Sequence, residues 1–95
     1  MKHFFVYILA SKRDGALYIG LTADLKWKVF EHKNDLVPGY AAKYKTHNLV
    51  YYELYYDAEA ATRRERQMKK RSRRWKLDLI EEKNPEWDDL YNRLL

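Results

Sequence analysis

The chain of 95 residues is long enough for one compact domain spanning residues 1–95, and its 46% hydrophobic and 16% aromatic content excludes a disordered chain. Because it contains no cysteine, disulfides, zinc fingers, cysteine nucleophiles and iron–sulfur clusters are excluded. The longest apolar run, Phe4 to Ala10, is too short for a membrane span and lacks the flanks of a secretory signal. We therefore expect a cytoplasmic protein without a membrane partner.

The formal net charge of +5 is concentrated in one short segment, which we call the basic segment, residues 63–76. It contains 9 basic residues and 1 acidic residue, a net charge of +8, whereas residues 1–62 carry +1 and residues 77–95 carry −4. Such a segment attracts phosphate backbones, although many helices carry basic faces that bind nothing. The residues that we expect to contact nucleic acid are Lys69, Lys70, Arg71, Arg73 and Arg74.

The first two predicted elements form a β-hairpin. Phe4–Ala10 is rich in β-branched and aromatic residues, which predicts a buried strand. Asp14 and Gly15 then predict a turn within residues 11–15, because they tolerate a positive φ angle. Residues 17–20 follow as the returning strand.

A helix is predicted next, over residues 23–33. Thr22 is its expected N-cap, and Asp24 lies in the first turn, where a carboxylate complements the helix dipole. Residues 34–48 contain mixed polar residues and predict a loop. A loop of this length is uncommon in a compact domain and is often functional.

The second half of the chain predicts one strand followed by helices. Residues 49–56 are rich in tyrosine and form the third predicted strand. Asp57 is the expected N-cap of a helix that ends near Lys70, and Ser72 is the expected N-cap of a helix over residues 73–82.

The C-terminal residues predict a short last helix. Asn84 followed by Pro85 is typical of an N-cap with proline at the first helical position. The apolar residues of this helix would be Trp87, Leu90 and Leu94. The predicted order is therefore β-β-α-β-α-α-α, an α/β or α+β domain with a small, mainly antiparallel sheet that helices must cover.

One acidic residue stands out on the second predicted helix. Ala61, Glu65 and Met68 are spaced i, i+4 and i+7 and share one face, on which Ala61 and Met68 are expected to turn inward. A partly buried carboxylate must be paired, protonated or bound to a metal ion. Glu65 is thus either an internal salt-bridge partner or a metal ligand.

The first helix and the hairpin hold the other candidates. His32 shares a helix stripe with apolar residues, and Lys28 lies one turn before it. Tyr7 and Tyr18 occupy one strand each of the hairpin. Each of these side chains has an ordinary packing role as its alternative, since tyrosine in a strand and histidine on an apolar stripe are usually structural.

The order of these patterns along the chain resembles the GIY-YIG nuclease superfamily, in particular its small stand-alone bacterial members. Tyr18-Ile19-Gly20 matches the second triplet of the family name in full. Only Tyr7 remains of the first triplet, because residues 5–7 read Phe-Val-Tyr. The resemblance continues in Asp24-Leu25, Glu31-His32-Lys33, Leu49-Val50-Tyr51-Tyr52-Glu53, Arg64-Glu65, Asn84-Pro85-Glu86-Trp87 and Asp89-Leu90.

The resemblance implies a nuclease that cuts phosphodiester bonds with one divalent metal ion, Mg²⁺ or Mn²⁺. It implies that Glu65 binds this ion, because the family has a metal-binding glutamate on the helix after the third strand. It also implies that Tyr7 and Tyr18 orient or deprotonate the attacking water, and that His32 lies near the nucleophile or the scissile phosphate.

The chain departs from the family at Lys28, where the family has an arginine that clamps the scissile phosphate. Lysine keeps the positive charge but lacks the planar, two-pronged donor of arginine. Two hypotheses follow from this difference. The protein is a nuclease that acts on DNA, structured or branched DNA included, slowed by Lys28; or it is a catalytically impaired module that binds nucleic acid through the basic segment.

The aromatic residues bear on partners. Strand alternation directs Tyr51 and Tyr55 to one face and Tyr52 and Tyr56 to the other, and sheet packing is the simplest role for all four. Trp75 is expected to pack in the core, with base stacking as the alternative. One tyrosine face left partly exposed is compatible with a monomer or a weak homodimer. We expect DNA rather than RNA as the nucleic acid. The loop at 34–48, the basic helix or a partner protein is the expected source of targeting.

Overall fold

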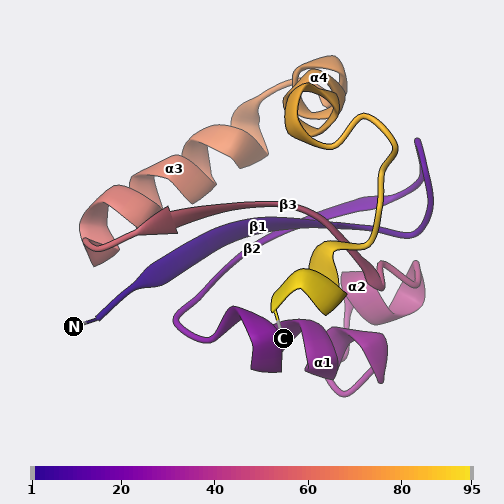
Figure 1. Ribbon diagram of the computed structural model, residues 1–95, viewed down its shortest axis with the longest axis horizontal. Helices are drawn as coiled ribbons and strands as arrows, with labels where there is room; N and C mark the ends of the chain where they lie inside the picture. The colour runs from indigo at the N-terminus through magenta and orange to yellow at the C-terminus, as the bar shows by residue number, and fades with distance from the viewer. Residues whose placement is uncertain (1, 95) are drawn as a thin grey trace.

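The computed structural model describes residues 2–94, in which three strands form one antiparallel sheet of order β2-β1-β3. Helices cover both faces of the sheet: α3 and α4 lie along one face, and α1, α2 and the 3₁₀ helix η1 lie along the other (Figure 1). The elements are β1 (Phe4–Ala10), β2 (Leu17–Thr22), α1 (Leu25–Lys33), α2 (Tyr40–Lys43), β3 (Asn48–Tyr55), α3 (Ala58–Lys70), α4 (Arg73–Lys83) and η1 (Leu90–Leu94). This arrangement confirms the predicted α+β class and adds the short helix α2 to the predicted order.

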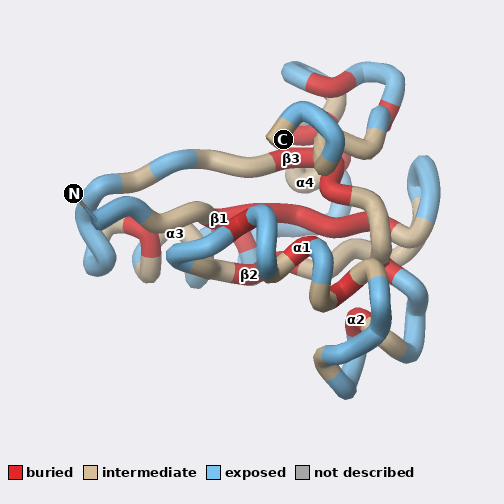
Figure 2. Tube along the Cα trace, turned by 60° about the horizontal axis from the view of Figure 1, so that its bottom comes forward, coloured by how far each residue is buried: buried red, intermediate tan, exposed pale blue. Residues whose placement is uncertain are grey.

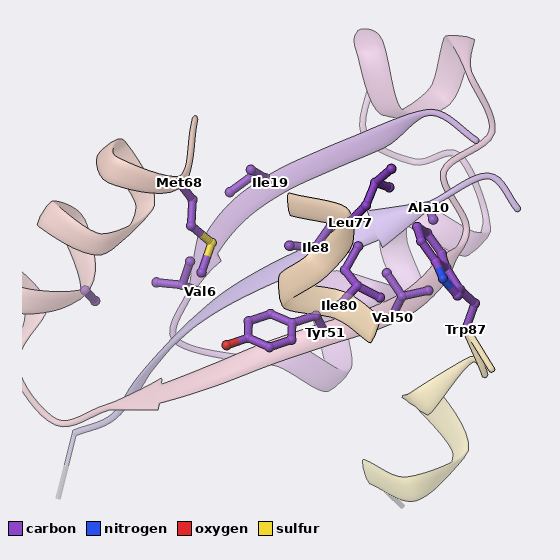
Figure 3. Close-up of a cluster of buried hydrophobic side chains, with 11 residues drawn as sticks. Val6, Ile8, Ala10, Ile19, Val50, Tyr51, Met68, Leu77, Ile80 and Trp87 are labelled. Atoms are coloured by element: carbon purple, nitrogen blue, oxygen red, sulfur yellow. The ribbon is translucent and has the colours of Figure 1, made fainter. Parts of the chain in front are cut away.

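The central strand β1 divides the interior into two hydrophobic clusters, because its side chains alternate between the two faces. Val6, Ile8 and Ala10 join the larger cluster under α3 and α4, where Met68, Leu77, Ile80 and Trp87 cover them (Figure 3). The opposite cluster, under α1 and η1, is formed by Tyr7, Leu9, Leu25, Val29 and Leu49. Val6–Ala10 of β1 are buried, whereas each α-helix combines buried, intermediate and exposed residues (Figure 2).

Two predicted boundaries at the start of α1 are wrong. β2 continues through Thr22, and the N-cap of α1 is Asp24, whose carboxylate accepts a hydrogen bond from the Trp27 amide at 3.1 Å. Asp24 was expected inside the first turn. A short polar side chain in a non-helical conformation caps equally well from either position, so the pattern alone did not separate Thr22 from Asp24. The N-caps predicted at Asp57 and Ser72 are confirmed.

The predicted C-terminal helix also differs. Asn84 is the C-cap of α4, and its side-chain amide donates to the Val50 carbonyl at 3.0 Å and to the Asp88 carbonyl at 2.9 Å. Trp87 lies outside any helix with φ at 56° and is buried in the larger cluster. Asn84 therefore ties the turn after α4 to β3, a contact made through space that local spacing does not indicate.

The predicted alternation of tyrosines on β3 is confirmed for Tyr51 and Tyr55, which share one face, and for Tyr52, which lies on the other. Tyr51 and Tyr55 join a polar network on their face. Tyr51 and Tyr55 both donate hydrogen bonds to Glu53, and Arg64 of α3 donates to both carboxylate oxygens at 2.8 and 2.9 Å. Burial acts to raise the pKa of Glu53, but the hydrogen bonds from Arg64 and the two tyrosines outweigh it and hold that pKa below its usual value. Arg64 also lies 5.4 Å from the centre of the Trp75 ring, which packs against the larger cluster as predicted.

We expect Arg64→Ala to lower the free energy of unfolding by about 2 kcal/mol, because it leaves the Glu53 carboxylate without its charged partner. The Arg64 and Glu53 side chains are only 23% and 15% exposed, so water replaces the lost donors poorly. Arg63→Ala, on the solvent side of the same helix, is the matched control and should cost less than about 0.5 kcal/mol. Urea unfolding followed by circular dichroism measures both changes, and equal losses would contradict the role of Arg64.

No helix within residues 2–94 is both long enough and apolar enough to cross a membrane.

Candidate active site

Tyr7 and Gly20 define the centre of the candidate site. Tyr7 on β1 pairs with Gly20 on β2 in the antiparallel register. A Cβ atom at Gly20 would lie 2.4 Å from both Cζ and Oη of Tyr7, so the phenol ring lies across the glycine. Only glycine leaves room for this path, which leads the Tyr7 hydroxyl toward the outer edge strand β2. This contact explains physically why the Tyr18-Ile19-Gly20 triplet ends in glycine.

His32 and Tyr18 meet Tyr7 at this position. Tyr7 Oη and His32 Nε2 are 3.3 Å apart, and both side chains are almost fully buried. The Tyr18 ring lies 5.1 Å from the His32 ring and 6.4 Å from the Tyr7 ring, measured between centroids. Three residues from β1, β2 and α1 thus converge, an arrangement that the family resemblance implied and that residue spacing alone did not predict. His32 Nδ1 is buried and makes no hydrogen bond within the described residues.

Charged residues on α1 surround this aromatic cluster. Lys28 is one turn before His32 and forms an ion pair with Glu31, with Nζ and Oε1 3.1 Å apart. Burial lowers the pKa of His32, Lys28 lowers it further, and Glu31 opposes them. His32 is therefore neutral at pH 7, and one of its ring nitrogens is free to accept a proton.

This lowered pKa makes the stability of the protein depend on pH. The unfolded chain protonates His32 near its ordinary pKa of about 6.5, whereas the folded protein resists protonation until lower pH. We expect the free energy of unfolding to be highest above this value and to fall as the pH drops through the folded pKa. Urea titrations between about pH 7.5 and 5 test this, with His32→Gln losing part of the slope and His3→Gln, on an exposed histidine, keeping it.

Glu65 approaches the cluster from α3, on the other face of the sheet. It lies beside the buried stripe of Ala61 and Met68, as the helical spacing predicted, and its side chain is 20% exposed. Its carboxylate pairs with Lys69, Oε2 to Nζ, at 3.4 Å. Burial raises the pKa of Tyr7, and Tyr18, Glu65 and Glu31 raise it further. The phenol of Tyr7 is protonated at neutral pH.

The carboxylate and imidazole groups of the site offer few ligands to a divalent metal ion. Within residues 2–94 no group of three or more His, Asp or Glu side chains could enclose a metal ion. A single partly exposed carboxylate still suits Mg²⁺ or Mn²⁺, because such ions keep several waters and bind through one or two carboxylates together with substrate phosphates. Glu65 therefore fits as the one protein ligand, with Lys69 as the cation that now neutralises it.

The five basic residues expected to bind nucleic acid lie in different environments. Arg73 donates hydrogen bonds to the carbonyls of Asp14 and Gly15, at 2.7 and 2.8 Å, and so holds the β1–β2 turn. Arg71 lies 5.3 Å from the centre of the Trp75 ring. Lys69 pairs with Glu65 and Arg74 pairs with Asp78, each on its own helix, and Lys70 has no carboxylate partner among the described residues. All five residues are exposed.

Two further residues belong to the site although residue spacing did not single them out as candidates. Glu31 acts on Lys28, His32 and Tyr7 at once, and its position three residues after Lys28 was the available signal for an ion pair. Lys76 of α4 lies with Lys69 beside Tyr18. No local pattern indicates that contact, because it depends on how α3 and α4 pack against β2.

Known proteins resemble this chain over most of its length. Residues 3–78 match the family model of the GIY-YIG catalytic domain. A UPF0213 protein of Staphylococcus saprophyticus is 36% identical over 81 residues, covering 85% of this chain and 96% of that protein. A UPF0213 protein of Staphylococcus aureus is 35% identical over 83 residues, covering 87% of this chain and 100% of that protein.

A solved structure shares the fold as well. The solution NMR structure of a UPF0213 protein from Bacillus halodurans superimposes with a TM-score of 0.55 at 28% sequence identity, covering 92% of each chain. The match of 3–78 includes the hairpin, α1, β3 and α3, the elements that carry the candidate site. The chain therefore belongs to the GIY-YIG nuclease superfamily and is similar to the small stand-alone UPF0213 proteins of bacteria.

Proposed function

We propose that this protein is a metal-dependent nuclease that hydrolyses phosphodiester bonds in DNA, structured DNA included. The observation that supports this most strongly is the meeting of Tyr7, Tyr18 and His32 over Gly20, with the charge of Glu65 acting on Tyr7 from the opposite face. Membership of the GIY-YIG superfamily supports the same class of reaction.

The chain's own residues divide the work as follows. The Tyr7 hydroxyl lies 3.3 Å from His32 Nε2 and donates to it in the tautomer that carries its proton on Nδ1, which leaves the lone pairs of that oxygen to orient the attacking water. Tyr18 bounds the site on the edge strand, and Lys28 binds the scissile phosphate in place of the family's arginine. Glu65 would hold the divalent ion, which when bound stabilises the negative charge that develops on the leaving oxygen.

Cleavage of a defined substrate panel tests this function. Purified protein is incubated with labelled single-stranded, duplex, flapped and branched DNA, and with matching RNA, in Mg²⁺, Mn²⁺ or EDTA. We expect cleavage of at least one DNA form with Mg²⁺ or Mn²⁺ and none in EDTA. Absence of cleavage of every form with both metal ions would refute the proposal.

Replacing Lys28 by arginine should increase activity. The guanidinium adds a second charge-assisted hydrogen bond to a phosphate oxygen. One such bond is expected to raise kcat/KM about tenfold, the equivalent of about 1.4 kcal/mol of transition-state binding. Lys26→Arg, on an exposed position of the same helix, is the matched control and should leave kcat/KM unchanged. A fall in kcat/KM for Lys28→Arg would show that Lys28 does not contact the phosphate.

One observation favours the alternative of a binding module without catalysis. Tyr7 is the residue proposed to act on the attacking water, but its pKa is raised by burial and by neighbouring negative charge, which opposes a role as a base. Such a module would bind DNA with an affinity that falls with salt concentration and survives Glu65→Gln. Neutralising Lys69, Lys70 and Arg74 together would weaken it.

A further inference from the structure

A small hollow of about 280 Å³ lies beside Tyr18 on the outer edge of the sheet. Three consecutive residues of β2 line it together with one residue each from α2, α3 and α4, namely Leu17, Tyr18, Ile19, Tyr40, Lys69 and Lys76. Because β2 is an edge strand, this hollow continues the surface of the candidate active site without an intervening strand. Its walls come from both helical layers of the protein.

Two lysines give the hollow a positive charge. Lys69 lines it and also reaches within 3.4 Å of the Glu65 carboxylate, so the hollow adjoins the candidate metal ligand. Lys76 is partly buried, and within residues 2–94 no carboxylate forms an ion pair with it. A partly buried ammonium group without a counter-ion attracts an anion, and phosphate is the anion that a nuclease substrate supplies.

Tyr40 presents an aromatic side chain to the same hollow. Its side chain is 50% exposed although it lies in a folded helix, and its ring is 4.6 Å from that of Tyr44, centroid to centroid. Tyr44, the C-cap residue of α2, helps to hold Tyr40 in place while leaving half of it open to solvent. An exposed aromatic ring beside basic residues is the arrangement on which unpaired bases stack.

We propose that this hollow is a subsite for the nucleotide next to the scissile phosphate. That nucleotide's own phosphate lies between Lys69 and Lys76, and its base stacks on Tyr40. Stacking on Tyr40 requires a base with an open face, whereas neighbouring base pairs cover both faces of a base inside a duplex. The base must therefore be unpaired, so the subsite selects strands with an unpaired nucleotide beside the cut. This inference rests on the proposed nuclease function.

Binding measured without catalysis tests the subsite. The probes are a fluorescein-labelled single-stranded oligodeoxynucleotide and the blunt duplex of the same sequence, followed by fluorescence anisotropy in EDTA. We expect Tyr40→Ala to weaken single-strand binding about tenfold and duplex binding by less than about twofold, while Tyr40→Phe retains the wild-type affinity. Tyr56→Ala, on an exposed tyrosine far from the hollow in sequence and outside its lining, is the matched control and should change neither affinity.

The role of Lys76 is tested through the salt dependence of single-strand binding. Lys76→Gln should weaken single-strand binding and reduce the slope of log K against log salt by about 0.7, the loss of one phosphate contact. Lys12→Gln, an exposed lysine on the β1–β2 turn, should leave the slope unchanged. Equal loss of single-strand and duplex affinity in Tyr40→Ala, an unchanged slope in Lys76→Gln, or no single-strand binding by the wild type would each overturn the subsite.

These outcomes are separable from those of the proposed function. A wild-type protein that cleaves DNA while Tyr40→Ala keeps its single-strand affinity and KM would retain the nuclease function and refute the subsite. A protein that cleaves nothing but loses single-strand affinity in Tyr40→Ala would refute the nuclease function and retain the hollow as a binding site for an unpaired nucleotide.

Discussion

Glu65→Gln is expected to reduce metal-dependent cleavage by about 10³-fold, the largest effect of any single substitution in this protein. The change removes the one carboxylate that fits a divalent ion and keeps the shape of the side chain. Because Glu65 is partly exposed and pairs only with Lys69 on its own helix, the loss of stability should stay within about 0.5 kcal/mol. Calorimetric titration of Mn²⁺ into the protein saturated with a non-cleavable phosphorothioate oligodeoxynucleotide should show that the ion no longer binds, because the ion is expected to need both the carboxylate and substrate phosphates.

Glu59→Gln provides the matched control. Glu59 lies on the same helix and forms the same kind of i, i+4 pair, with Arg63 at 3.8 Å, but its side chain is 83% exposed and far from the site. It should retain both cleavage and Mn²⁺ binding. If Glu65→Gln cleaved DNA at the rate of Glu59→Gln, Glu65 would be only an ion-pair partner of Lys69, the salt-bridge alternative left open by the helical spacing.

Tyr7→Phe is expected to lower kcat by about 10²-fold with little change in KM. It deletes the hydroxyl that lies 3.3 Å from His32 and leaves the ring across Gly20, so the packing of the hairpin is kept. The water that this hydroxyl orients would then lose one of its partners in the transition state, which lowers kcat rather than substrate affinity. Single-turnover cleavage with saturating enzyme measures the effect.

Tyr52→Phe is the matched control for Tyr7→Phe. Tyr52 is the register partner of Tyr7 on β3 and packs against the same hydrophobic cluster. Its substitution should change kcat by less than about twofold. Equal losses for the two variants would mean that the hydroxyl of Tyr7 acts through packing and not through the attacking water.

Lys28 and Glu31 determine the electrostatic environment of His32. Lys28 pairs with Glu31 at 3.1 Å, so in the free protein its charge is shared with a carboxylate. A phosphate must draw the ammonium group away from this partner, which is a further reason to expect slower catalysis than with the fork of arginine. Glu31 also opposes the lowering of the His32 pKa, so a phosphate that displaced Lys28 from Glu31 would change the field at the histidine.

Local patterns in the chain were sufficient to predict the three strands, α1, α3 and α4, and the faces of these elements on which the candidate residues lie. Alternation along β1 placed Tyr7 opposite Val6 and Ile8, and helical spacing placed His32 on the buried stripe of α1 and Glu65 beside that of α3. These predictions hold because a period of two or 3.6 residues decides which side chains share a face, independently of the rest of the fold.

Contacts between distant elements depended on the tertiary structure. Three such contacts join residues that are 11 to 59 positions apart in the sequence. They are the path of the Tyr7 ring over Gly20, the hydrogen bonds of Arg73 to the β1–β2 turn, and the ion pair of Arg64 with Glu53. The hollow that brings Tyr40 and Lys76 to one place is of the same kind. Side-chain period specifies a face but not its partner, because the partner is chosen by how helices and strands pack together. The positive charge of the basic segment could be read from the sequence. Which of its side chains contact other elements, as Arg73 does, and which remain on the surface was decided only by folding, because those contacts depend on how the helices pack on the sheet.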